Sequence, residues 1–266
     1  MGKGIVLLGL MIGSLAWGEP FYLPLDPEQN PAYIQLRGMT VSRREAPRPH
    51  ELIEGSFIPL GWGGERRFAY LLLPANEARD CNWAELHIQD LSTDKTLYTG
   101  EFELCSPTPT SSGEDRLTLL RRLEKLHRPT IGKQLARFGI APGQRPHLRE
   151  FPIPAAAGPV EYLLKTCRRS EPDFSRDDLF VTRWRLKLVL NRNKKGSRSK
   201  TVHSEDHKEF TGIYDMRVLG YFLSPRSTRA AILIAKLIRG WEGPPSVIGF
   251  QVVGASMEKG WKAGSG

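Results

Sequence analysis

The chain has 266 residues, of which 40% are apolar, 25% charged and 9% aromatic, and its formal net charge is +9. These values are ordinary for a globular protein, and they exclude collagen, a coiled coil, a fully disordered chain and a disulfide-dense mini-protein.

The first 18 residues predict a secretory signal peptide. One lysine, Lys3, precedes a short apolar stretch, and the small residues Ala16 and Gly18 stand where signal peptidase cleaves. A transmembrane anchor is the alternative, but the apolar run is shorter than the roughly 20 residues that cross a membrane. We therefore predict cleavage after Gly18 and a single secreted domain over residues 19–266. It would lie in the bacterial periplasm or the medium, with no membrane-spanning segment after cleavage.

The residue pattern before residue 106 predicts several β-strands. Residues 19–56 are rich in proline and read as an extended arm. The predicted strands are apolar or alternating runs bounded by Gly, Pro or polar turns. They lie at 33–41, 57–62, 68–73, 83–91 and 96–105.

The last two of these strands predict a hairpin. If residues 92–94 form a three-residue loop, Leu91 faces Lys95 and Ile88 faces Tyr98, which makes one side of the ribbon apolar. Glu85 then faces Glu101, a like-charge pair that argues against this register.

In the same register Cys81 falls opposite Cys105, and an oxidising compartment would close a disulfide between them. The alternatives are free thiols, or pairing of either cysteine with Cys167, because connectivity cannot be read from sequence.

A helical and proline-rich insert is predicted at about 106–160. Leucines at three-residue spacing from Leu117 to Leu126 predict an amphipathic helix that Pro129 ends. A second short helical piece would run over 131–138 and end at Gly139. One or two helices are thus expected around 114–138.

Strands return after the insert, and Thr182–Leu190 shows the clearest alternation in the chain. The run Ala230–Ile238 could be helical by composition, but its isoleucines and leucines favour a buried strand. Residues 255–266 read as a frayed tail. The other predicted strands lie at 160–166, from about 201, and at 247–253.

These elements predict a mostly β (α+β) fold of antiparallel meanders. Leu60-Gly61-Trp62 and Leu219-Gly220-Tyr221 each precede a turn and a strand, which suggests an internal repeat. Propeller-like half-blades are one form that such a repeat takes. Chance similarity is the alternative.

The two copies, together with Ile88–Lys95 and Gly240–Pro245, resemble uncharacterised secreted bacterial proteins. The resemblance covers under half of the chain and carries no catalytic residues. It implies a β-rich secreted protein and no particular activity.

The segment 183–200 is strongly basic and contains no acidic residue. It predicts a site for an anionic surface, either an anionic polymer or lipid headgroups. Export disfavours nucleic acid, and Trp184 points away from the basic side, so no stacking platform forms. A solvated hairpin tip is the alternative. The predicted binding residues are Arg183, Arg185, Lys187, Lys194, Lys195, Arg198 and Lys200.

The segment 201–209 contains the other group of interest. On a strand, His203, Glu205, His207 and Glu209 would share one face, and His203 and His207 could then ligate a metal such as zinc. The alternative, a solvated polar loop, is favoured, so neither a metal nor a cofactor is predicted.

The motifs of nucleotide binding, serine hydrolysis, thioredoxin-type redox chemistry and zinc proteolysis are missing. The leading hypothesis is a secreted, non-enzymatic protein that binds a partner in the cell envelope. An envelope hydrolase with an unrecognised, metal-dependent site around His203 and His207 is the alternative.

Overall fold

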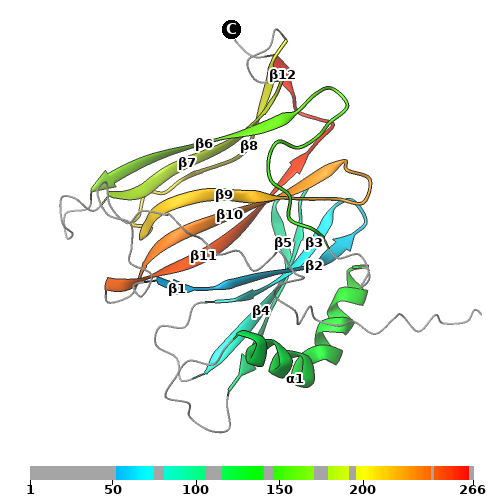
Figure 1. Ribbon diagram of the computed structural model, residues 1–266, viewed down its shortest axis with the longest axis vertical. Coiled ribbons are helices and arrows are strands. Elements are labelled where there is room, and N and C mark those ends of the chain that lie inside the picture. Colours follow the sequence, from blue (N-terminus) through cyan, green and yellow to red (C-terminus); the bar gives the residue numbers. More distant parts are fainter. Residues whose placement is uncertain are drawn as a thin grey trace, which may run out of the picture.

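The computed structural model describes residues 52–74, 81–105, 116–140, 146–170, 179–191, 196–240 and 243–263 (Figure 1). The predicted signal peptide and the predicted strand at 33–41 lie outside these residues. The described elements are β1 (Leu52–Glu54), β2 (Ser56–Gly63), β3 (Arg67–Leu73), β4 (Asn82–Asp90), β5 (Lys95–Leu104), α1 (Arg116–Arg137), β6 (Val160–Ser170), β7 (Leu179–Leu190), β8 (Arg198–Asp206), β9 (Ile213–Leu223), β10 (Arg229–Gly240), β11 (Gly243–Ser256) and β12 (Lys262–Ala263).

The strands form three four-stranded sheets, with orders β2-β3-β4-β5, β12-β8-β7-β6 and β1-β11-β10-β9. We name them the β2–β5 sheet, the β6–β8 sheet and the β9–β11 sheet. Strands that follow one another within a sheet pair antiparallel, and β1 joins β11 in parallel. The predicted fold class, mostly β with antiparallel meanders and one or two inserted helices, is confirmed, and one helix is present among the described residues.

The β9–β11 sheet lies between the other two sheets (Figure 1). Along β10, Ile232 and Ile234 pack with residues of the β6–β8 sheet, whereas Ala231 and Leu233 pack with residues of the β2–β5 sheet. Because both faces of β10 are buried, its sequence is a continuous apolar run. The preference for a strand over a helix at 230–238 is confirmed.

Helix α1 covers the opposite face of the β2–β5 sheet. Leu120 and Leu123 from its first half, and Ile131 and Leu135 from its second, join one cluster with that sheet. The predicted break at Pro129 is wrong, because the helix continues through it. Pro129 is exposed, so water can satisfy the carbonyl that lacks its helical donor. Burial on both sides of the proline holds the two halves in one helix.

The helix ends at Arg137, and the predicted stop, Gly139, lies in the turn that follows. Gly139 has a φ of 67°, which suits glycine because it has no side chain. The amide of Ile140 donates to the carbonyl of Leu135 at 2.9 Å, and the amide of Gly139 donates to that of Ala136 at 3.0 Å. This is the Schellman arrangement.

The suspected internal repeat has a common local geometry. Gly61 and Gly220 both follow a register shift, and their φ values are 153° and 157°. A Cβ atom on Gly220 would lie 2.4 Å from the carbonyl oxygen of Arg149. The leucine-glycine-aromatic pattern therefore marks a β-bulge, which at Gly220 also allows another backbone to approach closely.

The β4–β5 hairpin keeps the predicted register along most of its length, with Ile88 opposite Tyr98 and Glu85 opposite Glu101. The prediction fails near the turn, where the register shifts and Asp90 faces Lys95. Asp94 has a φ of 54°, and its Oδ1 accepts a hydrogen bond from the amide of Gly254 at 2.7 Å. The longer turn is thus tied to β11, a contact that the hairpin sequence alone does not show.

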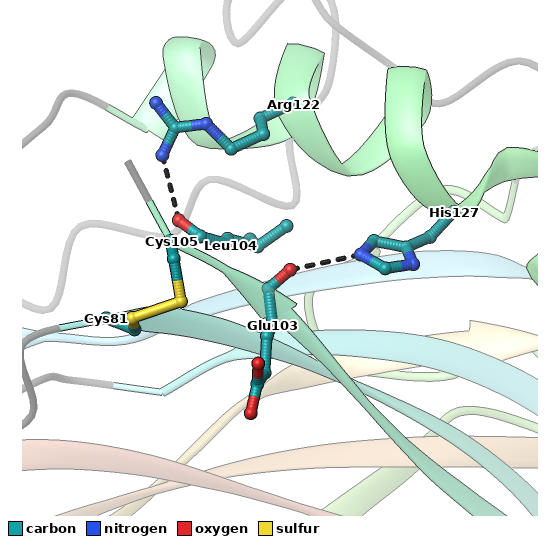
Figure 2. Close-up of a disulfide and its surroundings, with 6 residues drawn as sticks. All are labelled: Cys81, Glu103, Leu104, Cys105, Arg122 and His127. Carbon is teal, nitrogen blue, oxygen red and sulfur yellow. Dashed lines mark hydrogen bonds between the residues drawn. A yellow bond between two sulfur atoms is a disulfide. The ribbon is translucent and has the colours of Figure 1, made fainter. Parts of the chain in front are cut away.

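Cys81 and Cys105 close the open end of this hairpin as a disulfide, with their Cα atoms 4.5 Å apart (Figure 2). Above it, Arg122 and His127 of α1 hydrogen-bond to the carbonyls of Leu104 and Glu103, at 2.8 and 3.0 Å (Figure 2). Cys167 is an exposed free thiol. The expected Cys81–Cys105 pairing is confirmed.

The chain end departs from the predicted frayed tail. Strand β11 continues to Ser256, and β12 pairs with β8. Among the described residues, no helix is long and apolar enough to cross a membrane.

Candidate anion-binding face

Alternation along β7 places the apolar residues of the predicted basic segment on one side of the sheet and its charged residues on the other. Trp184, Leu186 and Leu188 have no exposed surface and form the inner side. Arg185 and Lys187 lie on the outer side, as the sequence pattern predicts. Three buried large side chains hold this strand in place beneath its charged residues.

Strand β6 adds a further cation to the same side. Lys165 is directly opposite Arg185, and Leu163 is opposite Lys187. On the other flank, β8 places Ser204 opposite Arg185. We call Lys165, Arg185 and Lys187 the basic face. Among the described residues, none of the three has a carboxylate partner. Like charges directly opposite one another disfavour strand pairing, so an anion here would relieve repulsion.

Arg183 lies on the same side of β7 but is paired. Its guanidinium lies 2.6 Å from the carboxylate of Asp206 on β8, and both side chains are more than half exposed. This hydrogen-bonded carboxylate raises the pKa of Arg183. The adjacent acid makes Arg183 a weaker candidate for anion binding than the basic face.

Lys200 does not belong to the basic face, in contrast to the prediction. It is buried, its Nζ lies 4.3 Å from the centre of the Trp261 ring, and it donates to the carbonyl of Lys259 at 3.0 Å. Burial lowers its pKa to about 8. The sequence could not show this, because Trp261 and Lys259 lie in the segment expected to be a frayed tail.

Of the three remaining predicted cations, the structure describes one, Arg198. Arg198 is opposite Leu190, on the inner side of the sheet, where it lines a pocket of about 390 Å³ with Met257 and Trp261. Lys194 and Lys195 lie outside the described residues.

The predicted His and Glu group forms a network around the Glu205 carboxylate. His203 Nε2 lies 2.8 Å from Oε1 of Glu205. Trp184 and Gln251 donate to the same carboxylate at 2.8 and 2.9 Å. His207 Nε2 lies 3.1 Å from Oε2. The network joins the β6–β8 sheet to β11 of the β9–β11 sheet.

The charges of this network reinforce one another. Asp94 and Glu205, on either side of the His203 ring, raise the pKa of His203 to about 9. Hydrogen bonds from His203, Gln251 and Trp184 hold the pKa of Glu205 far below its ordinary value. Burial lowers the pKa of Lys236, which lies over the Trp184 ring. At neutral pH the His203–Glu205 pair is therefore ionised.

The network does not resemble a metal centre. Within the described part of the chain, no three His, Cys, Asp or Glu side chains are grouped so that they could hold a metal ion. Glu209 lies beyond the end of β8 and is exposed. The partners of Glu205, namely Trp184 and Gln251, were missed from the sequence because they come from other strands.

A second His–Glu pair lies on β4, where His87 Nε2 is 2.9 Å from Oε2 of Glu85. The His87 ring stacks on Tyr70, with ring centres 5.1 Å apart. Trp83 donates to the same carboxylate at 3.1 Å. Their spacing of two on one strand is the signal that could have found this group.

No family model matches the chain, and neither the curated proteins nor the solved structures give a match. The resemblance to uncharacterised secreted bacterial proteins therefore stays a prediction, and function has to be argued from the site.

Proposed function

We propose that this is a secreted, non-enzymatic protein of the bacterial cell envelope that binds an anionic partner through the basic face. The observation that carries the proposal is the position of Lys165, Arg185 and Lys187. They lie together on the solvent side of one sheet, and no carboxylate partner is present among the described residues. The N-terminal sequence, with its apolar run and small residues before Glu19, supports export.

The sheet beneath these cations favours binding. Strands β6 and β7 pair along their whole length, and Trp184 and Leu186 anchor β7 from the inner side. The side-chain origins are therefore fixed before a partner arrives, which lowers the entropy lost on binding. A flexible basic tail would lack this advantage.

Retention on immobilised heparin tests the proposal. Arg185→Gln with Lys187→Gln should elute at lower salt than the wild type, because fewer counterions are released on binding. The matched control is Lys125→Gln with Lys133→Gln, which removes the same charge from the exposed side of α1. Equal shifts in both double variants would show that only net charge matters and would contradict the proposal.

Vesicles with and without an anionic lipid separate the two kinds of anionic surface. Binding to the anionic vesicles that the Arg185→Gln, Lys187→Gln variant loses would identify lipid headgroups. Binding to heparin alone would identify a polymer.

A further inference from the structure

Strand β6 is the open edge of the β6–β8 sheet. Its residues from Lys165 to Ser170 are mostly exposed. In the β2–β5 sheet, by contrast, α1 side chains already hydrogen-bond to β5 carbonyls at the end of the edge strand. Unprotected edge strands are templates for pairing with another chain.

The direction of the β6 backbone groups follows from one bridge. Val160 and Ile153 exchange both backbone hydrogen bonds, at 2.8 and 2.9 Å, on the side away from β7. Antiparallel pairing alternates these directions along a strand. The N–H and C=O groups of Tyr162, Leu164 and Thr166 therefore point to the same outer edge.

The chain that makes this bridge turns from β6 toward β9 after one paired residue. The Phe151 ring packs on both Tyr162 of β6 and Tyr221 of β9, with ring centres 4.7 and 5.2 Å apart, and Arg149 pairs with Tyr221. Among the described residues, no segment pairs with β6 beside Tyr162, Leu164 and Thr166. A groove of about 490 Å³ lies beside the first part of this edge, up to Leu164, and is lined by Phe151, Pro152, Glu161, Tyr162, Leu163 and Leu164.

We propose that the β6 edge takes up an extended acidic polypeptide segment as an additional strand. Its backbone would pair with Tyr162, Leu164 and Thr166, in the peptide-recognition mode known as β-augmentation. Side chains opposite Leu164 would enter the apolar groove. Side chains opposite Lys165 would lie on the outer side, within reach of the basic face, so carboxylates are favoured there. Glu161 disfavours an acid at the other end.

This proposal deepens the proposed function, since it rests on the basic face for its preference for acidic side chains. The backbone pairing does not depend on that face. Failure of the two proposals can therefore be distinguished by testing backbone and charge separately.

The experiment measures binding of a labelled peptide that alternates valine with aspartate, by fluorescence anisotropy, to the full chain. The same peptide, N-methylated at every second residue, lacks the backbone N–H donors along one of the two edges of its strand. We expect N-methylation on the pairing edge to weaken binding at least tenfold. Thr166→Pro should do the same, because it removes an outward N–H that β7 does not use. Thr166→Ala, the matched control, should bind as the wild type does.

Two N-methylated peptides are made, one modified at the odd-numbered residues and one at the even-numbered residues. If both bind as tightly as the unmodified peptide, strand addition is overturned, even when heparin binding persists. Strand addition is also overturned if the protein binds heparin but not the unmodified peptide. Loss of heparin binding to the basic face, with N-methyl-sensitive peptide binding retained, would overturn the proposed function and the acidic preference alone. The peptide arm decides the question if Thr166→Pro fails to fold.

Discussion

Loss of the proton from His203 should make the protein less stable at alkaline pH. The folded pKa of about 9 lies above the ordinary value of 6.5. Protonation therefore stabilises the fold fully below about pH 6.5, and this contribution is lost as the pH rises through about 9. Each pH unit between the two values corresponds to about 1.4 kcal/mol, which sets an upper limit of roughly 3 kcal/mol.

The expected effect is smaller because water screens the pair. In the His203–Glu205 pair, 19% and 26% of the two side chains are exposed, so we expect about half of the limit, roughly 1.5 kcal/mol. Urea unfolding at several values between pH 6 and pH 10, followed by tryptophan fluorescence, measures it. His203→Gln keeps a polar side chain but cannot titrate, so subtracting its profile removes the effects of Lys200 and Lys236. Parallel pH profiles for the variant and the wild type would refute the reasoning.

Three further predictions concern the fold. The double substitution Cys81→Ser, Cys105→Ser should lower the free energy of unfolding by about 3 kcal/mol on the chain-entropy model, and unreduced peptide mapping should give a Cys81–Cys105 peptide; a bridged Cys167 peptide would contradict the pairing. Glu65 accepts hydrogen bonds from the turn at 224–228, and these bonds outweigh partial burial and lower its pKa. Glu65→Gln should therefore lower the free energy of unfolding by about 1 kcal/mol at pH 7, and by progressively less as the pH falls below 4.5, as measured by urea unfolding. A loss that is the same at pH 7 and below pH 4.5 would contradict this. Pro129→Ala should raise the unfolding free energy by about 1 kcal/mol or more, because it restores a helical N–H at an exposed position; a lower melting temperature would show that the proline is needed.

Local pattern predicted most of the strands because each is a short period-two or continuous apolar run. It failed where distant segments decide. The turn of the β4–β5 hairpin follows its bond to Gly254, and α1 passes Pro129 because both of its halves are buried on one sheet. In each case a contact from another part of the chain outweighs the local preference.

The candidate site divides in the same way. Alternation along β7 was enough to place Arg185 and Lys187 on one side. The contribution of Lys165 depends on the register between β6 and β7, and the burial of Lys200 depends on Trp261. Sequence spacing describes one strand at a time, whereas a binding face is assembled from several.

The salt dependence of heparin binding to the full chain tests the central claim most directly. Counterion release predicts that log Kd is linear in log salt concentration, with a slope that falls by roughly 0.7 to 0.9 for each contacting cation removed. The triple variant Lys165→Gln, Arg185→Gln, Lys187→Gln should therefore reduce the slope by about two to three, with the fold unchanged by circular dichroism. A slope equal to that of the wild type would show that the basic face does not bind the anion.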